Sequence, residues 1–141
     1  MRGFDLRVDT AFESVVPACA DPTRPHGWIT PEIVAAYTRL HDLGWAHSIE
    51  TWQDDQLVGG LYGVGIGAFF AGESMFHHVT DASKAAVAGM VAVMSTCEQA
   101  LLDVQWSTPH LASLGVVEVD RRTYLERLAL AVRSPGPDAF A

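Results

Sequence analysis

The sequence predicts an α+β or α/β fold: one layered domain in which a mixed, largely antiparallel sheet is flanked by helices. Its 141 residues match the length of one domain, and 49% hydrophobic against 18% charged residues supply an ordinary globular core. Between residues 46 and 79, turn residues separate three apolar segments, and a helix that is apolar nearly all round follows them. Strand-rich blocks on both sides of a buried helix favour this fold class. We expect the domain to span residues 1–133, with a flexible tail over residues 134–141.

The first third of the chain predicts one strand and two helices. Residues 4–8 alternate apolar and polar side chains as a half-buried strand does, and Asp9 is placed to cap a short helix after it. Prolines and aspartate in residues 19–27 predict a loop. Thr30 then predicts the cap of a second helix with proline at its first position, and Gly44 predicts its end.

The rest of the chain predicts an antiparallel meander followed by mixed elements. Strands of the meander are expected over residues 47–52, 57–64 and 68–76. After it we expect a helix capped by Asp81 and running to Met94, a strand over 101–105, a helical turn over 110–114, a strand over 116–119 and a helix over 121–132. The order of these elements resembles an acetyltransferase-like fold of the GNAT type.

Composition and charge exclude several classes of protein. Seventeen acidic and nine basic residues give a net charge of -8, so we do not expect broad electrostatic capture of nucleic acid. Cys19 and Cys97 fit neither a disulfide framework nor a zinc motif. The longest apolar run, residues 85–94, is too short to span a bilayer, and the amino terminus lacks a signal core. The sequence therefore predicts a soluble, cytoplasmic protein without membrane attachment.

Glycines and histidines give no cofactor or metal motif. Residues 63–68 match G-x-G-x-x-A, but Phe69 and Phe70 continue a strand where a dinucleotide fingerprint needs a helix. We expect the glycines of the wider glycine-rich run, residues 59–67, to let backbones or a ligand approach closely within a sheet. The six histidines show no metal-ligand spacing, and the sequence contains neither a serine elbow nor a cysteine–histidine pair. Metal binding and covalent catalysis are therefore not indicated.

Three polar residues stand in apolar surroundings. Glu73 interrupts the last strand of the meander, and Asp103 and Gln105 lie on the short strand after the buried helix. Because side chains alternate along a strand, Asp103 and Gln105 are expected to project from the same face. A buried carboxylate needs hydrogen-bonding partners or a ligand. On these residues alone, a structural hydrogen-bond network and a functional site are equally favoured.

Motifs spread over most of the chain, from Gly3 to about Leu128, resemble those of one family in their order. They are Trp28-Ile29, Ala36-Tyr37, Leu40-His41, His47-Ser48-Ile49-Glu50, Trp52, Leu57 to Val64, Gly72 to Phe76, Ala82-Ser83-Lys84, Asp103-Val104-Gln105 and His110 to Gly115. This set is similar to the leucyl/phenylalanyl-tRNA protein transferases. The resemblance implies an aminoacyl transferase that moves Leu or Phe from charged tRNA to the amino terminus of a protein beginning with Arg or Lys, marking it for degradation.

The resemblance also implies which residues bind the donor. Trp28 would stack on the terminal adenosine at the 3′ end of the tRNA, an interaction worth about 1 to 3 kcal/mol per base, with core filling as the alternative. Phe70 matches the family position that lines the pocket for the donor side chain. From spacing alone, Val87, Met90 and Met94 form one face of the buried helix and extend the pocket wall, although plain core packing is the favoured interpretation of that face by itself.

The implied reaction is attack of an α-amine on an aminoacyl ester, which is already activated and needs no cofactor, metal or nucleotide hydrolysis. An α-amino group has a pKa of about 7.7 to 8.0, so part of it is neutral at pH 7. We expect the carbonyl of Gln105 to orient the attacking amine, while Asp103 fixes Gln105 and favours the developing ammonium. Glu73 would help to hold the cationic amino terminus or its Arg or Lys side chain.

The family's usual amino-terminal domain has no counterpart before Met1. On the basis of the resemblance we therefore expect a fragment, a misplaced start, or a reduced member whose missing part would come from a partner chain. Two other functions stay open. One is a non-catalytic or partner-dependent module that binds basic amino termini. The other is an acyl-CoA N-acetyltransferase, which would need an Arg/Gln-x-x-Gly-x-Gly/Ala pyrophosphate loop that the sequence lacks.

Overall fold

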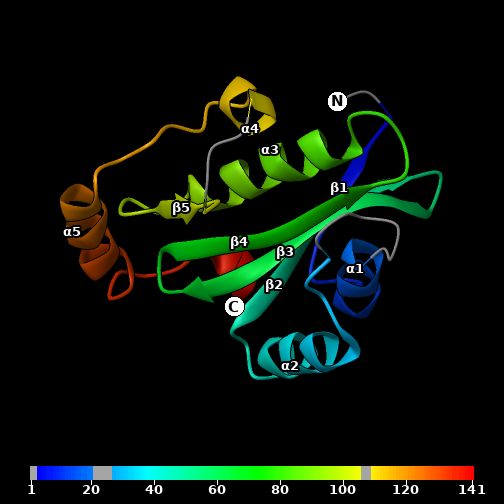
Figure 1. Ribbon diagram of the computed structural model, residues 1–141, viewed down its shortest axis with the longest axis horizontal. Helices are drawn as coiled ribbons and strands as arrows, with labels where there is room; N and C mark the ends of the chain where they lie inside the picture. Colours follow the sequence, from blue (N-terminus) through cyan, green and yellow to red (C-terminus); the bar gives the residue numbers. More distant parts are fainter. Residues whose placement is uncertain (1–2, 21–26, 106–108) are drawn as a thin grey trace.

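The described residues form a five-stranded sheet whose strand order follows the chain (Figure 1). A computed structural model describes residues 3–20, 27–105 and 109–141, so the loop predicted over residues 19–27 lies mostly outside them. The strands are β1 (Asp5–Val8), β2 (Ala46–Gln53), β3 (Gln56–Ile66), β4 (Phe69–His77) and β5 (Leu101–Asp103). Neighbours from β1 to β4 pair antiparallel, and β5 pairs parallel with β4. The predicted mixed, largely antiparallel sheet is confirmed.

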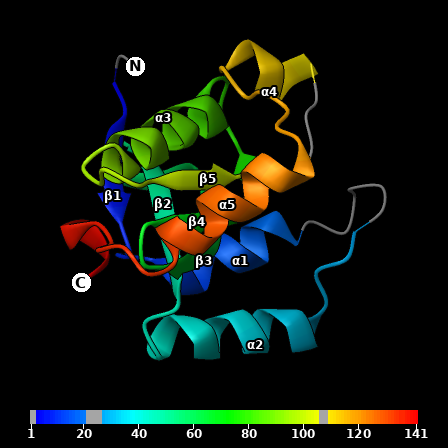
Figure 2. The ribbon, with the colours of Figure 1, turned by 90° about the vertical axis from the view of Figure 1, so that its left-hand side faces the viewer.

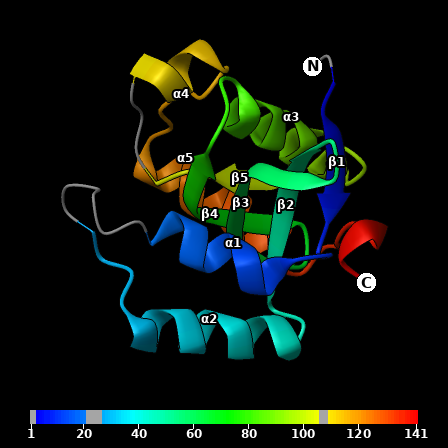
Figure 3. The same cartoon turned by 90° about the vertical axis from the view of Figure 1, so that its right-hand side faces the viewer.

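Helices cover both faces of this sheet. They are α1 (Phe12–Cys19), α2 (Pro31–Asp42), α3 (Ala82–Met94), α4 (Pro109–Ser113), α5 (Arg121–Ala131) and the 3₁₀ turn η1 (Asp138–Phe140). α3 packs on one face and α1 on the other, while α2 lies beyond α1 as seen from the sheet (Figures 2 and 3). Every described helix is too short or too polar to cross a lipid bilayer.

Each face of the sheet has its own hydrophobic core. The α1-side core is formed by Phe12, Val15, Val16, Cys19, Ala46, Tyr62 and Phe76. The α3-side core is formed by Ile49, Leu61, Phe70, Ala86, Val87, Met90 and Met94. α3 approaches β3 so closely that a Cβ atom on Gly59 would lie 2.5 Å from the Cβ atom of Ala82. The prediction that glycines permit close approach within the sheet is therefore confirmed at Gly59.

Helix starts were predicted at three cap residues, and the structure confirms one side-chain cap. The Thr30 hydroxyl accepts a hydrogen bond from a backbone N–H of the first turn of α2 at 3.3 Å. Asp9 instead accepts hydrogen bonds from the backbone N–H of Ser48 at 2.8 Å and from Nδ1 of His47 at 2.7 Å, and α1 begins farther along. Asp81 precedes α3 with a φ of +68°, and its side chain makes no cap bond.

Glu50 is a buried carboxylate on β2 that bonds to the residues just before α1. It lies on β2 with no exposed surface, and its oxygens accept hydrogen bonds from the Ala11 N–H at 2.9 Å, the Ser48 hydroxyl at 2.6 Å, the Trp52 indole N–H at 3.3 Å and the Thr10 hydroxyl. Four donors compensate the loss of water around a buried charge. Since Ala11 directly precedes α1, these bonds fix the helix to the sheet.

Two predicted strands differ from the structure. The strand expected over residues 101–105 ends at Asp103, because Gln105 has a φ of +76°, outside the β region. Residues 116–119 form no strand, because α5 rather than a further strand lies against β5. The apolar alternation of this segment consequently has no sheet face to cover, and Val117 is 75% exposed.

The end of the chain packs against the sheet where a flexible tail was expected. The Phe140 ring stacks on that of His47 with centroids 4.0 Å apart, and its centroid lies 5.5 Å from that of Phe70. Farther back, the Ala68 N–H donates to the Ala131 carbonyl at 2.9 Å, which holds the end of α5 at the turn between β3 and β4. Aromatic stacking therefore adds the last residues to the α3-side core.

Candidate functional site

A β-bulge in β4 places Glu73 at the centre of the candidate site. In the pairing of β3 with β4, Tyr62 faces Ser74, and the next residue, Gly63, faces Gly72. Glu73 is thus the extra residue that has no opposite partner. Such a bulge re-aims side chains and shifts their alternation by one residue.

The bulge reverses the faces of β4. Phe70 and Met75 are an odd number of residues apart, yet both pack in the α3-side core, whereas Phe76 packs in the α1-side core. Glu73 lies where the strand changes face. Tyr37 on α2 lies near enough that, after burial, the charge of Glu73 contributes to the raised pKa of its hydroxyl.

The pairing of β5 with β4 ends just before this bulge in β4. Residues 101–103 pair with residues 69–71, and the ladder stops there. Beyond the ladder, the side chain of Gln105 bonds to β4 instead of the backbone. Its Nε2 atom donates to the Gly72 carbonyl at 3.0 Å and to Oε2 of Glu73 at 3.2 Å. Because both bonds use Nε2, the amide orientation is fixed and its oxygen lies on the opposite side of the group.

A cavity of about 330 Å³ lies where the two strands part. It is lined by Leu61, Gly72, Glu73, Ser74, Met75, Val87, Met90, Val104, Gln105 and Leu111. These residues come from β3, β4, α3, α4 and the segment after β5. The volume lies at the small end of the range for ligand pockets, which suits one side chain of a ligand better than a whole cofactor.

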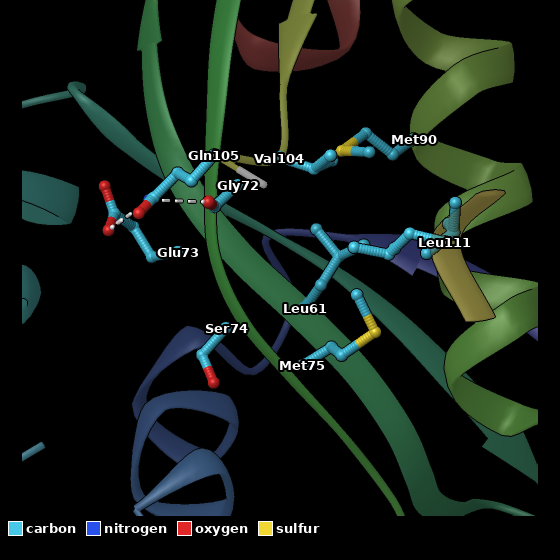
Figure 4. A pocket seen from close by; sticks show the side chains of 10 residues that line it. Leu61, Gly72, Glu73, Ser74, Met75, Met90, Val104, Gln105 and Leu111 are labelled. Atoms are coloured by element: carbon cyan, nitrogen blue, oxygen red, sulfur yellow. Dashed lines mark hydrogen bonds between the residues drawn. The ribbon is translucent and has the colours of Figure 1, made fainter. Parts of the chain in front are cut away.

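The cavity has an apolar wall and a polar rim. In Figure 4, Leu61, Met75 and Leu111 point toward one another, whereas Glu73 points away on the other side of β4. Gln105 reaches toward Glu73 across the strand. A ligand with an apolar side chain and a polar reacting group would match this division.

The Asp103 carboxylate connects Gln105 to α5. Its Oδ1 atom accepts the backbone N–H of Gln105 at 2.6 Å, and its Oδ2 atom accepts the hydroxyl of Tyr124 at 2.5 Å. Burial, followed by the hydrogen bond to Asp103 and its charge, raises the pKa of Tyr124 to about 12. The hydroxyl therefore stays protonated at neutral pH and remains a donor.

Two further tyrosines lie near Glu73. Burial, followed by the charge of Glu73 and a hydrogen bond to it, raises the pKa of Tyr37 to about 12. Tyr62 is fully buried with its ring centroid 5.1 Å from that of Tyr37, and burial is also the main cause that raises its pKa. Its hydroxyl has no hydrogen-bond partner among the described residues.

The structure brings together the three polar residues that the sequence singled out. Glu73, Asp103 and Gln105 form one hydrogen-bonded chain at the cavity rim. The reason given from strand alternation is wrong for Gln105, since hydrogen bonds hold it beyond the end of β5. Val87 and Met90 line the cavity. The chemical roles of all five residues stay predictions.

The other predicted binding residues lie away from the cavity lining. Phe70 and Met94 are fully buried in the α3-side core. Trp28 is 45% exposed, and its ring lies edge-on to Tyr37 with centroids 6.4 Å apart. Through Tyr37 it approaches Glu73 from the α2 side. Their roles in donor binding also stay predictions.

Sequence reasoning missed several members of the site. Tyr124 and Tyr37 reach Asp103 and Glu73 from α5 and α2, and Leu111 of α4 closes the apolar wall. These contacts join residues far apart in the chain, so periodicity could not reveal them. The one available signal was a tyrosine that follows three polar residues at the start of α5.

Asp9, His41 and His47 bring metal-ligating atoms within 4.8 Å of one another. Nδ1 of His41 lies 2.8 Å from the Ala46 carbonyl, and Nδ1 of His47 lies 2.7 Å from Oδ2 of Asp9. Both partners are acceptors, so each Nδ1 carries a proton and is not available as a metal ligand. This group is explained as a hydrogen-bonded support for β2.

The chain is similar in sequence to one family over nearly its whole length. The family model described as leucyl/phenylalanyl-tRNA protein transferase matches residues 1–129. Curated relatives named leucyl/phenylalanyl-tRNA–protein transferase include those of Zymomonas mobilis, 53% identical over 133 residues, and Azoarcus sp., 50% identical over 141 residues. The matches cover 93% and 96% of this chain but 50% and 59% of the relatives. The chain thus spans between half and three fifths of their length.

A solved structure is similar in fold. It is AAC(6')-Iy in complex with the bisubstrate analogue CoA-S-monomethyl-acetylneamine, with a TM-score of 0.56 and 14% sequence identity. The match covers 84% of this chain and 93% of that chain. At this identity the likeness concerns the fold alone, and the acetyltransferase-like architecture predicted from the element order is confirmed.

Proposed function

Because the chain belongs to the leucyl/phenylalanyl-tRNA protein transferase family, we propose that it is an aminoacyltransferase that moves Leu or Phe from the 3′ end of an aminoacyl-tRNA to the amino terminus of a protein beginning with Arg or Lys. One observation carries the proposal. The amide of Gln105 is fixed between Asp103 and Glu73 at the rim of an apolar cavity. That arrangement suits a reaction in which an amine attacks beside a buried side chain.

The apolar wall would take the donor side chain. Full burial of a Leu or Phe side chain is worth about 1.5 to 3 kcal/mol. Met75 and Met90 line the cavity, and flexible thioether side chains adapt to either a branched or an aromatic group. The exposed ring of Trp28 would stack on the terminal adenosine. Donor binding would therefore depend on the acylated end of the tRNA.

The polar rim would orient the acceptor amine. With both hydrogen bonds of the Gln105 side chain made by Nε2, its amide oxygen can accept a hydrogen from the neutral amine. The amine nitrogen forms the new bond to the ester carbonyl carbon, the bond to the ribose oxygen breaks, and the amine proton ends on the released ribose hydroxyl. Asp103 would favour the positive charge that develops on the nitrogen.

Glu73 would select the acceptor. Its carboxylate lies at the rim beside Gln105, where a cationic amino terminus or an Arg or Lys side chain would be attracted and an acidic residue repelled. The net charge of -8 acts in the same direction over longer distances.

The test is transfer of labelled Leu to a peptide that begins with Lys, with charged tRNA as the donor. We expect a peptide bond to form without ATP. Asp103→Ala and Gln105→Ala should each lower kcat/KM by about 100-fold or more, because loss of positioning has an effect of that size. Gln56→Ala, at the exposed hairpin between β2 and β3, is the matched control and should retain activity.

Two outcomes would contradict the proposal. Transfer that survives both substitutions would remove these residues from the mechanism. Binding of basic peptides without any transfer would favour a non-catalytic module. Acetyl-CoA offered in place of aminoacyl-tRNA should give no product, since the likeness to AAC(6')-Iy concerns the fold alone.

A further inference from the structure

Tyr124 contacts the site from an element that the proposed chemistry does not use. It lies in the first turn of α5, and its hydroxyl donates to Oδ2 of Asp103 at 2.5 Å. Among the described residues, the other hydrogen bond to this carboxylate comes from the backbone N–H of Gln105, on Oδ1. One donor on each oxygen prevents the carboxylate from rotating about its Cβ–Cγ bond.

The bonds continue from Asp103 to the cavity rim. Gln105 has a left-handed φ of +76°, and the hydrogen bond that its backbone N–H donates to Oδ1 of Asp103 stabilises this conformation. Its side chain in turn donates to the Gly72 carbonyl and to Glu73 on the bulge. An unbroken series of hydrogen bonds therefore runs from α5 to β4 through the amide that faces the acceptor.

We propose that Tyr124 is a positioning residue of the transfer reaction, which holds Asp103 and, through it, the amide of Gln105 in the orientation that the attacking amine needs. The inference rests on the proposed function. Tyr124 acts through Asp103 and makes no contact with the reacting atoms in this scheme. The other end of α5 is anchored separately by the bond between Ala68 and Ala131, so the hydroxyl of Tyr124 is not required to keep the helix on the sheet.

Tyr124→Phe removes the hydroxyl and keeps the ring. We expect kcat to fall about 10- to 100-fold, while KM for peptide and for aminoacyl-tRNA changes less than about threefold. Asp120→Ala is the matched control: Oδ1 of Asp120 accepts the Thr123 N–H at 3.3 Å and caps the same helix, so this change loosens the start of α5 without touching Asp103. Its kcat, corrected for the folded fraction, should stay within about twofold of the wild type. Equal losses in both variants would reduce Tyr124 to a structural contact and overturn the inference.

A double variant separates action through Asp103 from an independent effect. In an Asp103→Ala background, Tyr124→Phe should cause no further loss of kcat, because the carboxylate that it holds is absent. A second loss of similar size would show that Tyr124 acts by another route.

Amide NMR keeps this test distinct from that of the proposed function. A wild-type chain that transfers no amino acid contradicts the proposed function. The effect of Tyr124 on the position of Gln105 is then measured directly from the amide signals of Gln105. The backbone and side-chain amide signals of Gln105 should shift in Tyr124→Phe and stay in place in Asp120→Ala. Unchanged Gln105 signals in Tyr124→Phe would overturn the inference whatever the activity.

Discussion

Two glutamates on the same sheet have surroundings that assign them different roles. Glu50 has no exposed surface and accepts four hydrogen bonds, of which the two from Thr10 and Ala11 tie the start of α1 to β2. Glu73 lies on a bulge at the cavity rim, where it accepts one bond from Gln105 and, after burial as the larger cause, contributes to the raised pKa of Tyr37. The hydrogen bonds of the first carboxylate are accounted for by the fold, whereas we propose that the second meets the acceptor peptide at the cavity rim.

Conservative substitution should separate these two roles. Glu73→Gln removes a charge from the rim, so we expect about tenfold lower turnover on peptides beginning with Arg or Lys and an almost unchanged free energy of unfolding. Glu50→Gln places an amide against buried donors and should lower the free energy of unfolding by about 2 to 4 kcal/mol. Urea denaturation and peptide turnover measure both effects. If Glu73→Gln unfolds the chain and peptides beginning with Glu react as well as those beginning with Arg, the role of Glu73 is structural.

At the scale of elements, the bulge and the parting of β4 from β5 create the site together. Gly63, on the neighbouring strand β3, leaves room for the backbone and the Phe70 ring of β4 beside the bulge. A Cβ atom on Gly63 would lie 2.2 Å from the Ala71 carbonyl oxygen and 2.7 Å from Cζ of Phe70. The ring of Phe70 thus fills the space that a side chain on β3 would otherwise occupy.

Alanine at Gly63 should consequently displace the strand or the ring. We expect Gly63→Ala to lower the free energy of unfolding by about 2 kcal/mol or more, as overpacking of a core does. Its paired partner provides the control, because a Cβ atom on Gly72 would meet nothing closer than the Asp103 carbonyl oxygen at 3.7 Å. Gly72→Ala should stay within about 1 kcal/mol of the wild type in chemical denaturation. Equal stabilities of the two variants would show that both the backbone of β4 at Ala71 and the ring of Phe70 move aside freely.

Most elements could be predicted from the sequence because they follow local patterns. The three strands of the meander and the apolar helix α3 have periodicities that a single segment reveals. Residues 116–119 misled because their alternation has the period of a strand, while α5 takes the place at β5 where a strand would pair. The polar residues of the site could be named, but the bulge at Glu73 and the contact from Tyr124 depend on register and on distant elements, which local patterns do not contain.

On the scale of the whole molecule, the three tyrosines of the chain share one property. Each is buried enough that its pKa rises above the ordinary value of about 10, to about 12 for Tyr37 and Tyr124 and further for Tyr62. Protonated tyrosine is therefore favoured by folding. This contribution to stability is fully present below about pH 10 and is lost as the pH rises through about 12, because the unfolded chain releases its protons first.

Ultraviolet titration of tyrosinate should show this directly. The native protein should give little tyrosinate at pH 10, where the chain in denaturant is about half ionised. Stability against urea should fall between about pH 10 and 12. Tyr124→Phe should remove one of the two steps near pH 12. A native tyrosine that ionises near pH 10 would contradict the burial described for these side chains.

The order of strands in the sheet also has a consequence for the path by which the chain folds. β2, β3 and β4 are hairpin neighbours, so their pairing closes only short loops, whereas β5 reaches β4 after the whole of α3. We expect the meander to form early and the pairing of β5 with β4 to form late. In pulsed hydrogen exchange during refolding, amides of β2 and β3 should gain protection before those of Leu101 to Asp103; simultaneous protection would contradict this sequence of events. Late pairing of β5 with β4 would let the end of the sheet that carries the cavity open and close while the rest of the sheet stays folded.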